Sequence, residues 1–267
     1  MTPDDIALIR RCAESSRAAA RKLAATDAAT RTRALEAIAK ALEAREARVL
    51  AANALDLHAA AAAGLSTAMQ DRLRLDAARF HALVAAVRAV NALLDPLGDV
   101  EWQPPRADGL EIGHLRAPLG AIAMIYESRP NVTVDAAVLS LKSGNAVALR
   151  GGREAAHSNA ALIGAVQAGL RDAGLPPEAA VLVPVFERAA IAELLKHDDC
   201  LALVIPRGGE GLIRHVAEVS RVPVIRHYKG VCHLYVEASA DLDAALRLAV
   251  DGKCARPSAC NALETLL

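Results

Sequence analysis

The chain is poor in aromatic residues and carries no excess charge of either sign. Aromatics make up 2% of its 267 residues, and 31 lysines and arginines balance 31 aspartates and glutamates. Without a basic excess there is no general electrostatic attraction for nucleic acid. With so few aromatics, there are also few surfaces on which bases stack. The composition therefore argues against a nucleic-acid-binding function.

Cysteine is scarce and irregularly spaced. The chain has five, namely Cys12, Cys200, Cys232, Cys254 and Cys260. An odd number at irregular spacing is not a disulfide framework, which favours the reducing cytoplasm as location. The spacing gives no zinc site either, because the adjacent Cys232 and His233 would point to opposite faces of a strand. We predict no bound metal.

Long apolar runs are absent. No run approaches the roughly 20 residues needed to cross a bilayer, so we predict no membrane association. The N-terminus is rich in Ala and Arg, but Asp4, Asp5 and Glu14 interrupt it, unlike a transit peptide. Thr2 as a cap and Pro3 in the first turn indicate a helix instead.

Hydrophobic residues make up 54% of the chain, enough for a large α/β domain or for one domain and part of a second. Helical periodicity extends over residues 3–97, with Asp27 and Asp76 as expected caps. Residues 98–116 are rich in glycine and proline and predict a β-hairpin arm. Such an arm either covers a sheet edge or pairs with another subunit.

Beyond Pro118 the pattern alternates between strand and helix. Predicted strands span 121–126, 145–149, 181–185, 201–205 and 222–225, and predicted helices span 134–142, 155–173, 189–196 and 211–219. Near-continuous apolar strands between helices indicate a parallel sheet covered on both faces. In such sheets, ligands bind outside the carboxyl ends of the strands.

Two glycine-containing loops follow predicted strands. The loop residues are Arg150, Gly151 and Gly152 after one strand, and Arg207, Gly208 and Gly209 after another. Glycines at a strand-to-helix turn let the backbone approach a phosphate, and arginine suits phosphate oxygens. The spacing is not that of a dinucleotide fingerprint, and such turns also occur as pure geometry. Nucleotide binding and a structural turn both stay open on these residues.

A third loop carries Glu127, Ser128, Arg129 and Asn131, directly after the strand 121–126. This polar cluster is suited to holding a substrate carboxylate or phosphate, or to donating an amide to an oxyanion. Alternatively, Ser128 or Asn131 merely caps the next helix.

Cys260 lies in a turn of small residues with Lys253 and Arg256 nearby. A neighbouring cation favours the thiolate, which is the form that acts as a nucleophile. The alternative is a buried, inert cysteine, and the local sequence alone favours that alternative.

Together these segments resemble one family. The runs at 125–136, 141–147, 149–152, 205–209 and 256–262 resemble the signature of γ-glutamyl phosphate reductases, within the aldehyde dehydrogenase superfamily. The resemblance covers nearly the whole chain. It implies an α/β, aldehyde-dehydrogenase-like fold: a cofactor-binding domain of N-terminal helices plus a Rossmann-like parallel sheet (1–97 and 117–229), a β-hairpin oligomerisation arm (98–116) and the start of a catalytic domain (230–267).

The resemblance implies the NADPH-dependent reduction of L-glutamyl 5-phosphate to L-glutamate 5-semialdehyde and phosphate, in L-proline biosynthesis. Cys260 matches the nucleophile. Its thiolate would attack the acyl phosphate and expel phosphate, leaving a thioester. Hydride from the nicotinamide would then give a hemithioacetal that collapses to the aldehyde.

Other roles are also implied by the resemblance. Arg150, with Gly151 and Gly152, falls near the cofactor ribose, and Arg207, Gly208 and Gly209 fall near its diphosphate. Asn131 would serve the oxyanion, and residues 127–129 the substrate. His227 stands where hydrolytic relatives have a glutamate base, which suits a reaction without water attack; either it transfers a proton or it packs at a strand end.

The family also implies partners: an acyl phosphate substrate, further copies of the chain in a homo-oligomer, and coupling to glutamate 5-kinase. Family members continue beyond the position of Leu267, so we expect a C-terminally truncated chain. One alternative is an inactive fragment that retains nucleotide or subunit binding. Another is an acyl-CoA-dependent relative, against which the Glu-Ser-Arg-Pro-Asn run at 127–131 argues. NADH instead of NADPH stays open, with Arg150 and Arg153 as candidates for binding a 2′-phosphate.

Overall fold

The computed structural model describes residues 1–226, 230–257, 259 and 261–267. The chain divides into two compact units, Met1–Arg226 and His227–Leu267.

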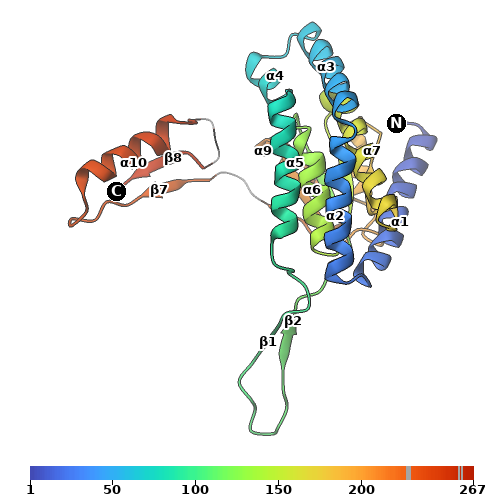
Figure 1. The fold of residues 1–267 in the computed structure, drawn as a ribbon, viewed down its shortest axis with the longest axis horizontal. Coiled ribbons are helices and arrows are strands. Elements are labelled where there is room, and N and C mark those ends of the chain that lie inside the picture. Colours follow the sequence, from blue (N-terminus) through green and yellow to red (C-terminus); the bar gives the residue numbers. More distant parts are fainter. Residues whose placement is uncertain (227–229, 258, 260) are drawn as a thin grey trace. The chain divides into compact units, whose positions relative to one another are not determined.

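The first unit begins with five helices (Figure 1). They are α1 (Pro3–Ala24), α2 (Ala28–Glu43), α3 (Glu46–Ala62), α4 (Thr67–Leu73) and α5 (Ala77–Ala92). The side chains of Thr2, Asp27 and Asp76 accept hydrogen bonds from the first turns of α1, α2 and α5. The caps expected from the sequence are therefore confirmed.

Strands β1 (Val100–Trp102) and β2 (Gly113–Leu115) form an antiparallel hairpin that extends away from the helices (Figure 1). A Cβ atom on Gly113 would lie 2.7 Å from Val100 Cγ1 and 2.9 Å from the Trp102 ring. Glycine at this position of β2 leaves room for the side chains of Val100 and Trp102, which lie against it from β1. The expected hairpin is confirmed.

The remaining strands of this unit form a four-stranded parallel sheet in the order β5-β4-β3-β6. Its strands are β3 (Ala121–Tyr126), β4 (Ala146–Arg150), β5 (Ala180–Leu182) and β6 (Leu203–Arg207). The chain winds outward from β3 to β5 and returns to β6 on the other side of β3. The winding therefore reverses between β3 and β6, which is where doubly wound sheets bind ligands.

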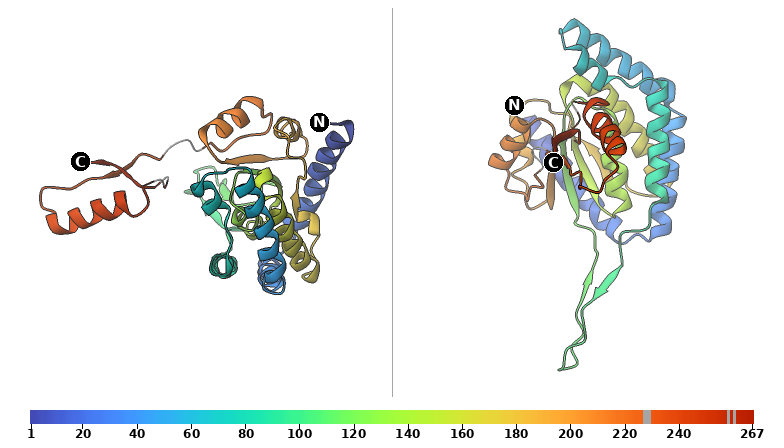
Figure 2. Two further views of the ribbon diagram at one scale, coloured as in Figure 1. Left: turned by 90° about the horizontal axis from the view of Figure 1, so that it is seen from above. Right: turned by 90° about the vertical axis from the view of Figure 1, so that its left-hand side faces the viewer.

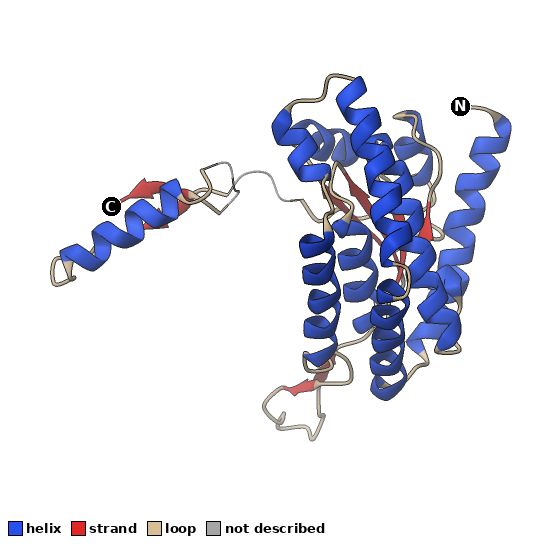
Figure 3. Cartoon of the chain, turned by 45° about the horizontal axis from the view of Figure 1, so that its top comes forward, coloured by secondary structure: helices blue, strands red, loops and turns tan. Residues whose placement is uncertain are grey.

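Helices cover both faces of the sheet (Figures 2 and 3). α6 (Asn131–Lys142) and α7 (Ala156–Asp172) pack on one face, and α2, α3 and α5 pack outside them. α1 packs on the other face beside α8 (Ala189–Leu194), which in turn contacts α9 (Glu210–Val219). Short 3₁₀ turns at Arg153–Ala155 and Pro177–Ala179 complete the connections. The predicted covered parallel sheet is confirmed.

Some boundaries differ from the sequence prediction. The strand expected at 222–225 is wrong, because this segment makes only a single bridge, from Val224 to Val204. Pro223 within it has no N–H group to donate to a ladder. Pro184 similarly explains why β5 ends at Leu182 instead of reaching residue 185. α6 begins at Asn131, three residues before its expected start.

One large apolar cluster fills the first unit. Its buried members extend from Ile9 in α1 to Val222 and include the sheet strands. At the centre of the α2–α7 contact, a Cβ on Gly169 would lie 2.5 Å from the Ile38 Cα atom. The two helices pack backbone against backbone there.

The second unit contains β7 (Cys232–Leu234), α10 (Leu242–Cys254) and β8 (Leu263–Leu266). β7 and β8 pair in parallel, and α10 contacts β8. Asp241 caps α10 by accepting from the amides of Asp243 and Ala244. α10 buries none of its residues, so this unit has little core.

Candidate active site

The three loops singled out in the sequence follow the neighbouring strands β3, β4 and β6 and leave the sheet at the carboxyl ends of these strands. Ile125 of β3 lies opposite Arg150 of β4, and Tyr126 lies opposite Arg207 of β6. Since the strands are parallel, residues 127–130, 151–154 and 208–209 all extend from their carboxyl ends. The structure thus brings the predicted cofactor and substrate loops together at the point where the winding reverses.

Glu127 links the loop after β3 to the loop after β6. Its Oε2 atom accepts a hydrogen bond of 3.0 Å from the Gly209 amide, at the start of α9. A Cβ on Gly208 would lie less than 3.0 Å from the same carboxylate oxygen, so glycine leaves room for Glu127 in this position. Gly209 differs, because a Cβ on it would meet no atom within 4 Å. Space is open at Gly209, beside the N-terminus of a helix, where phosphates bind favourably.

Ser128 has a strained backbone. Its φ of 45° is the only positive φ among the non-glycine residues that the structure describes. Its amide and its hydroxyl both donate to Glu154 Oε1, each at 2.7 Å. A Cβ on Gly152 would collide with this Glu154 carboxylate. Glu154 therefore ties the β4–α7 loop to the β3–α6 loop, and Gly152 makes room for it.

Arg150 is buried, with 8% of its surface exposed. Its Nη2 atom donates to the carbonyls of Phe186 (2.7 Å) and Glu187 (3.3 Å), which fixes the connection after β5. Burial lowers the pKa of this guanidinium, and the nearby carboxylates of Glu154 and Glu127 oppose that change. Arg150 is thus at least partly a structural residue. Arg129 and Arg207, in contrast, are exposed.

A chain of buried polar groups lies beneath Gly151. The Tyr126 hydroxyl lies 2.6 Å from Thr133 Oγ1, which donates to Asn159 Oδ1 at 2.8 Å. A Cβ on Gly151 would collide with the Asn159 amide nitrogen, which has no hydrogen-bond partner among the described residues. Burial raises the pKa of Tyr126, which keeps the phenol protonated. This network sets the backbone path of the glycine loop.

Neither Ser128 nor Asn131 caps α6, so that alternative interpretation of the third loop is wrong. Pro130 occupies the cap position, and no side chain makes a capping hydrogen bond. Instead, the Asn131 amide donates to Asp135 Oδ2 at 2.8 Å within the helix. Burial raises the pKa of Asp135, and the hydrogen bond from Asn131 opposes that change.

The N-termini of α7 and α9 differ in what occupies them. The buried Asp56 of α3 accepts from the amides of His157 and Ser158 and from the Ser158 hydroxyl, at 3.1, 2.7 and 2.6 Å. A fixed carboxylate therefore already occupies the α7 end. At the α9 end, the carboxylate that accepts from the Gly209 amide belongs to the exposed Glu127 and not to a buried residue, so α9 is the better anion position.

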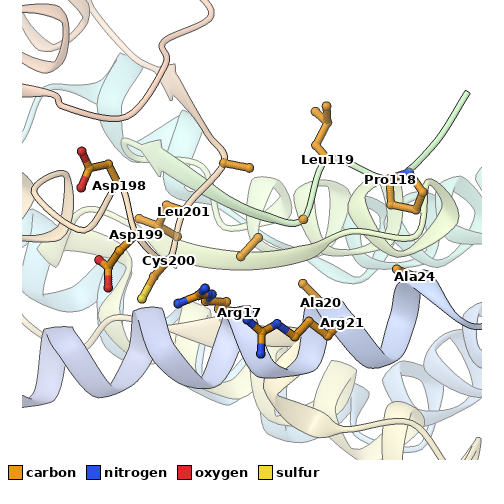
Figure 4. Close-up of a pocket in the computed structure, with 13 residues that line it drawn as sticks. Arg17, Ala20, Arg21, Ala24, Pro118, Leu119, Asp198, Asp199, Cys200 and Leu201 are labelled. Atoms are coloured by element: carbon orange, nitrogen blue, oxygen red, sulfur yellow. The ribbon is translucent and has the colours of Figure 1, made fainter.

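A hollow among the described residues lies elsewhere (Figure 4). It measures about 370 Å³ and is lined at the amino end of the sheet by Arg17 and Arg21 from α1 and by the segment around Cys200. Burial raises the pKa of the Cys200 thiol, and the nearby Asp199 adds to this. The thiol is therefore a poor nucleophile. This hollow lies at the amino ends of the strands, whereas the three loops lie at their carboxyl ends.

Two predicted catalytic residues, Cys260 and His227, lie outside the described residues. Two cations were predicted to flank Cys260. Arg256 is exposed, and the Nζ atom of Lys253 lies 3.6 Å from Oε2 of Glu264. Across the described part of the chain, no group of three metal-binding side chains gathers, and no helix is long and apolar enough to cross a membrane.

Comparison with known proteins agrees with this architecture. The family model described as aldehyde dehydrogenase family matches residues 4–266. The chain belongs to this family. Members use nicotinamide cofactors.

Similar relatives share one name. The chain is 54% identical to the γ-glutamyl phosphate reductase of Xanthomonas campestris pv. campestris (strain B100), over 97% of this chain and 63% of that protein. It is equally similar, at 54%, to the one from Xylella fastidiosa (strain 9a5c), over 97% of this chain and 62% of the relative. The crystal structure of γ-glutamyl phosphate reductase from Thermotoga maritima superposes with a TM-score of 0.90 at 37% identity, covering 97% of this chain and 62% of that one. The chain therefore spans less than two thirds of the length of these relatives.

Sequence reasoning missed Glu154, Asp56 and Asn159. Glu154 stands two residues after Gly152, and that short spacing was the available signal for a carboxylate folding back over a glycine. Asp56 lies about a hundred residues from the helix it caps, and no local pattern indicates that contact.

Proposed function

We propose that the protein carries out the NADPH-dependent reduction of L-glutamyl 5-phosphate to L-glutamate 5-semialdehyde and phosphate, a step of L-proline biosynthesis. The observation that carries this proposal is the identity of 54% to γ-glutamyl phosphate reductases over 97% of the chain. The meeting of the three signature loops at one sheet edge supports it.

The residues at this edge fit a dinucleotide. Gly209 leaves room beside the α9 N-terminus, and the exposed Arg207 stands next to it to meet a diphosphate. Exposed Arg153 is the better candidate for a 2′-phosphate, because Arg150 is buried and bonded to the Phe186 carbonyl. We therefore keep Arg207 and Gly209 as diphosphate residues, and assign Gly208 to making room for Glu127 and Arg150 to shaping the neighbouring loop.

The proposed chemistry divides one hard displacement into two easier steps. The Cys260 thiolate attacks the acyl carbon, the carbon–oxygen bond to phosphate breaks, and a thioester forms. Asn131 donates the second hydrogen of its amide, the one not bonded to Asp135, to the developing oxyanion, and Arg129 binds an anionic group of the substrate. The nicotinamide, when bound, supplies the hydride. His227 in place of a glutamate base avoids activating water, which would hydrolyse the thioester.

The direct test is an assay in the oxidative direction, with glutamate 5-semialdehyde, phosphate and NADP⁺, followed by NADPH absorbance. We expect turnover that the Cys260→Ala variant loses by at least about a thousandfold, because a thiol nucleophile has no substitute there. Cys254→Ala is the matched control and should retain activity. Wild-type activity in Cys260→Ala would contradict the mechanism.

A second candidate function is nucleotide binding without turnover. The observation that favours it is that α10 buries none of its residues and exposes Leu242, Leu246 and Leu248 at 61–72%. Binding of NADPH without any turnover, alongside turnover by one of the longer relatives, would support this alternative.

We also propose that the hairpin of β1 and β2 pairs with another copy of the chain. Trp102 and Leu115 on it are 64% and 62% exposed, so a second copy that pairs with the hairpin would cover apolar surface. Trp102→Ser combined with Leu115→Ser should lower the mass measured by light scattering. An unchanged oligomer would contradict this role. Cytoplasmic location and coupling to glutamate 5-kinase stay predictions from the sequence.

A further inference from the structure

Glu154 lies outside the residues that the family signature assigns to the site, yet it links the loops of the site. We infer that Glu154 is a positioning residue that fixes the β3–α6 loop and, through it, the β6–α9 loop. This inference rests on the proposed nucleotide site for its functional consequence, but the geometric part stands without it.

The first step is the strain at Ser128. Its φ of 45° lies in the left-handed region, which a non-glycine residue avoids unless its surroundings hold it there. The two 2.7 Å hydrogen bonds from Ser128 to Glu154 Oε1 are the interactions that do so. They use both the amide and the hydroxyl, so they fix the peptide and the side chain together.

The second step is the neighbouring residue. Glu127 directly precedes Ser128, so the direction of its side chain depends on the backbone that Glu154 holds. Glu127 in turn accepts from the Gly209 amide at 3.0 Å. The Glu154 carboxylate thus orders the loop after β3. The Glu127 carboxylate extends that order to the loop after β6, where we place the diphosphate.

The third step concerns the glycines. Gly152 and Gly208 each lack the Cβ that would collide with one of these carboxylates, Glu154 and Glu127 respectively. Two glycines that suggested phosphate contact in the sequence therefore make room for the links between the loops. Gly209 has no such collision and is the one left for a ligand.

The test uses the full 267-residue chain. Glu154→Ala removes both hydrogen bonds. Glu154→Gln removes only the charge, since both bonds go to a single oxygen that the amide can still present. Glu187→Ala is the matched control, because Glu187 also acts on Arg150 by its charge but its carboxylate makes no hydrogen bond among the described residues. Ser128→Ala removes one of the two bonds and serves if Glu154→Ala fails to fold.

Two readouts are taken: hydrogen exchange of peptides covering 126–131 and 207–213 without ligand, and the Kd for NADPH from its fluorescence. We expect Glu154→Ala to exchange faster in both peptides and to raise the Kd about tenfold, the equivalent of one or two hydrogen bonds. Ser128→Ala should lie between it and the wild type. Glu154→Gln and Glu187→Ala should match the wild type.

Equal effects of Glu154→Gln and Glu154→Ala would overturn the inference, because charge and not geometry would then be responsible. Faster exchange confined to 126–131 would also overturn it, since the link to the β6–α9 loop would be absent. If the wild type binds no NADPH while both peptides respond as expected, the proposed function fails and the positioning role of Glu154 stands.

Discussion

Asp56 shows what one buried carboxylate does at the residue scale. It satisfies two amides at the start of α7 and the hydroxyl of Ser158, and only 3% of its surface is exposed. We predict that Asp56→Ala lowers the free energy of unfolding by about 2–4 kcal/mol, because it leaves the two buried donors of Ser158 and the part-buried amide of His157 without this acceptor. Urea denaturation measures this change.

The matched control for that variant is Asp172→Ala, at the exposed C-terminal end of α7. An acidic residue there opposes the helix dipole, so its removal should be neutral or slightly stabilising. Equal midpoints for the two variants would contradict the capping role of Asp56.

Asp135 gives a prediction about pH. Burial raises its pKa in the folded state, so the native protein binds this proton more readily than the unfolded chain. Its contribution to stability is therefore full below the unfolded pKa, about pH 4, and is lost as the pH rises through the folded pKa. Asp135→Asn resembles the protonated form, and we expect it to raise the urea midpoint at pH 7.

That gain should shrink as the pH is lowered from 7 toward 4. Urea titrations of both proteins across this range measure it. A gain that stays constant with pH, or that is largest at pH 4, would show that the carboxylate is not held at a raised pKa.

For individual residues, the sequence predicted which of them lie in the site loops but not which residues they contact. Glu127, Ser128 and Gly209 were predicted as site residues, because polar and glycine residues after apolar strands form a local pattern. Their partners were not predictable, since Ser128 meets Glu154 and Glu127 meets Gly209 across loops that only the sheet order brings together.

Helix packing carries the clearest prediction at the scale of elements. Both Gly164 and Gly169 lie in α7, but only Gly169 faces the α2 backbone, where a methyl group on it would lie 2.5 Å from Ile38 Cα. We predict that Gly169→Ala lowers the free energy of unfolding by about 1–3 kcal/mol, because the helices must move apart.

Gly164→Ala is the matched control, since a Cβ there meets nothing within 4 Å. It should be neutral or stabilise by up to about 1 kcal/mol, the difference in helix propensity. Thermal or urea unfolding of the pair measures both changes. Equal stability of the two variants would contradict the close approach of α2 and α7.

Most elements followed from apolar periodicity and caps, and the exceptions have local causes. Pro223 and Pro184 limit two expected strands, because a proline cannot donate to the ladder. The early start of α6 at Asn131 could not be predicted, since its first turn has no side-chain cap and depends on the loop that Ser128 and Glu154 hold.

The two units of the whole molecule differ in how much they bury. The large apolar cluster lies within Ile9–Val222, whereas Ala262 is the one buried apolar residue among those described in the second unit. Stability in water comes mainly from such burial. We therefore predict that a chain ending at Arg226 folds by itself and unfolds in urea within about 0.5 kcal/mol of the full chain.

Hydrogen exchange of the full chain provides the second measurement of this prediction. α10 exposes Leu242, Leu246, Leu248 and Val250 and buries no residue, so its amides should exchange far faster than those of α7. If the shorter chain is less stable by several kcal/mol, or if α10 is as protected as α7, residues 227–267 must contribute to one cooperative fold. In that case the activity assay and the stability measurements would have to be interpreted together, because any variant that loosens the second unit would also unfold the three loops that follow β3, β4 and β6.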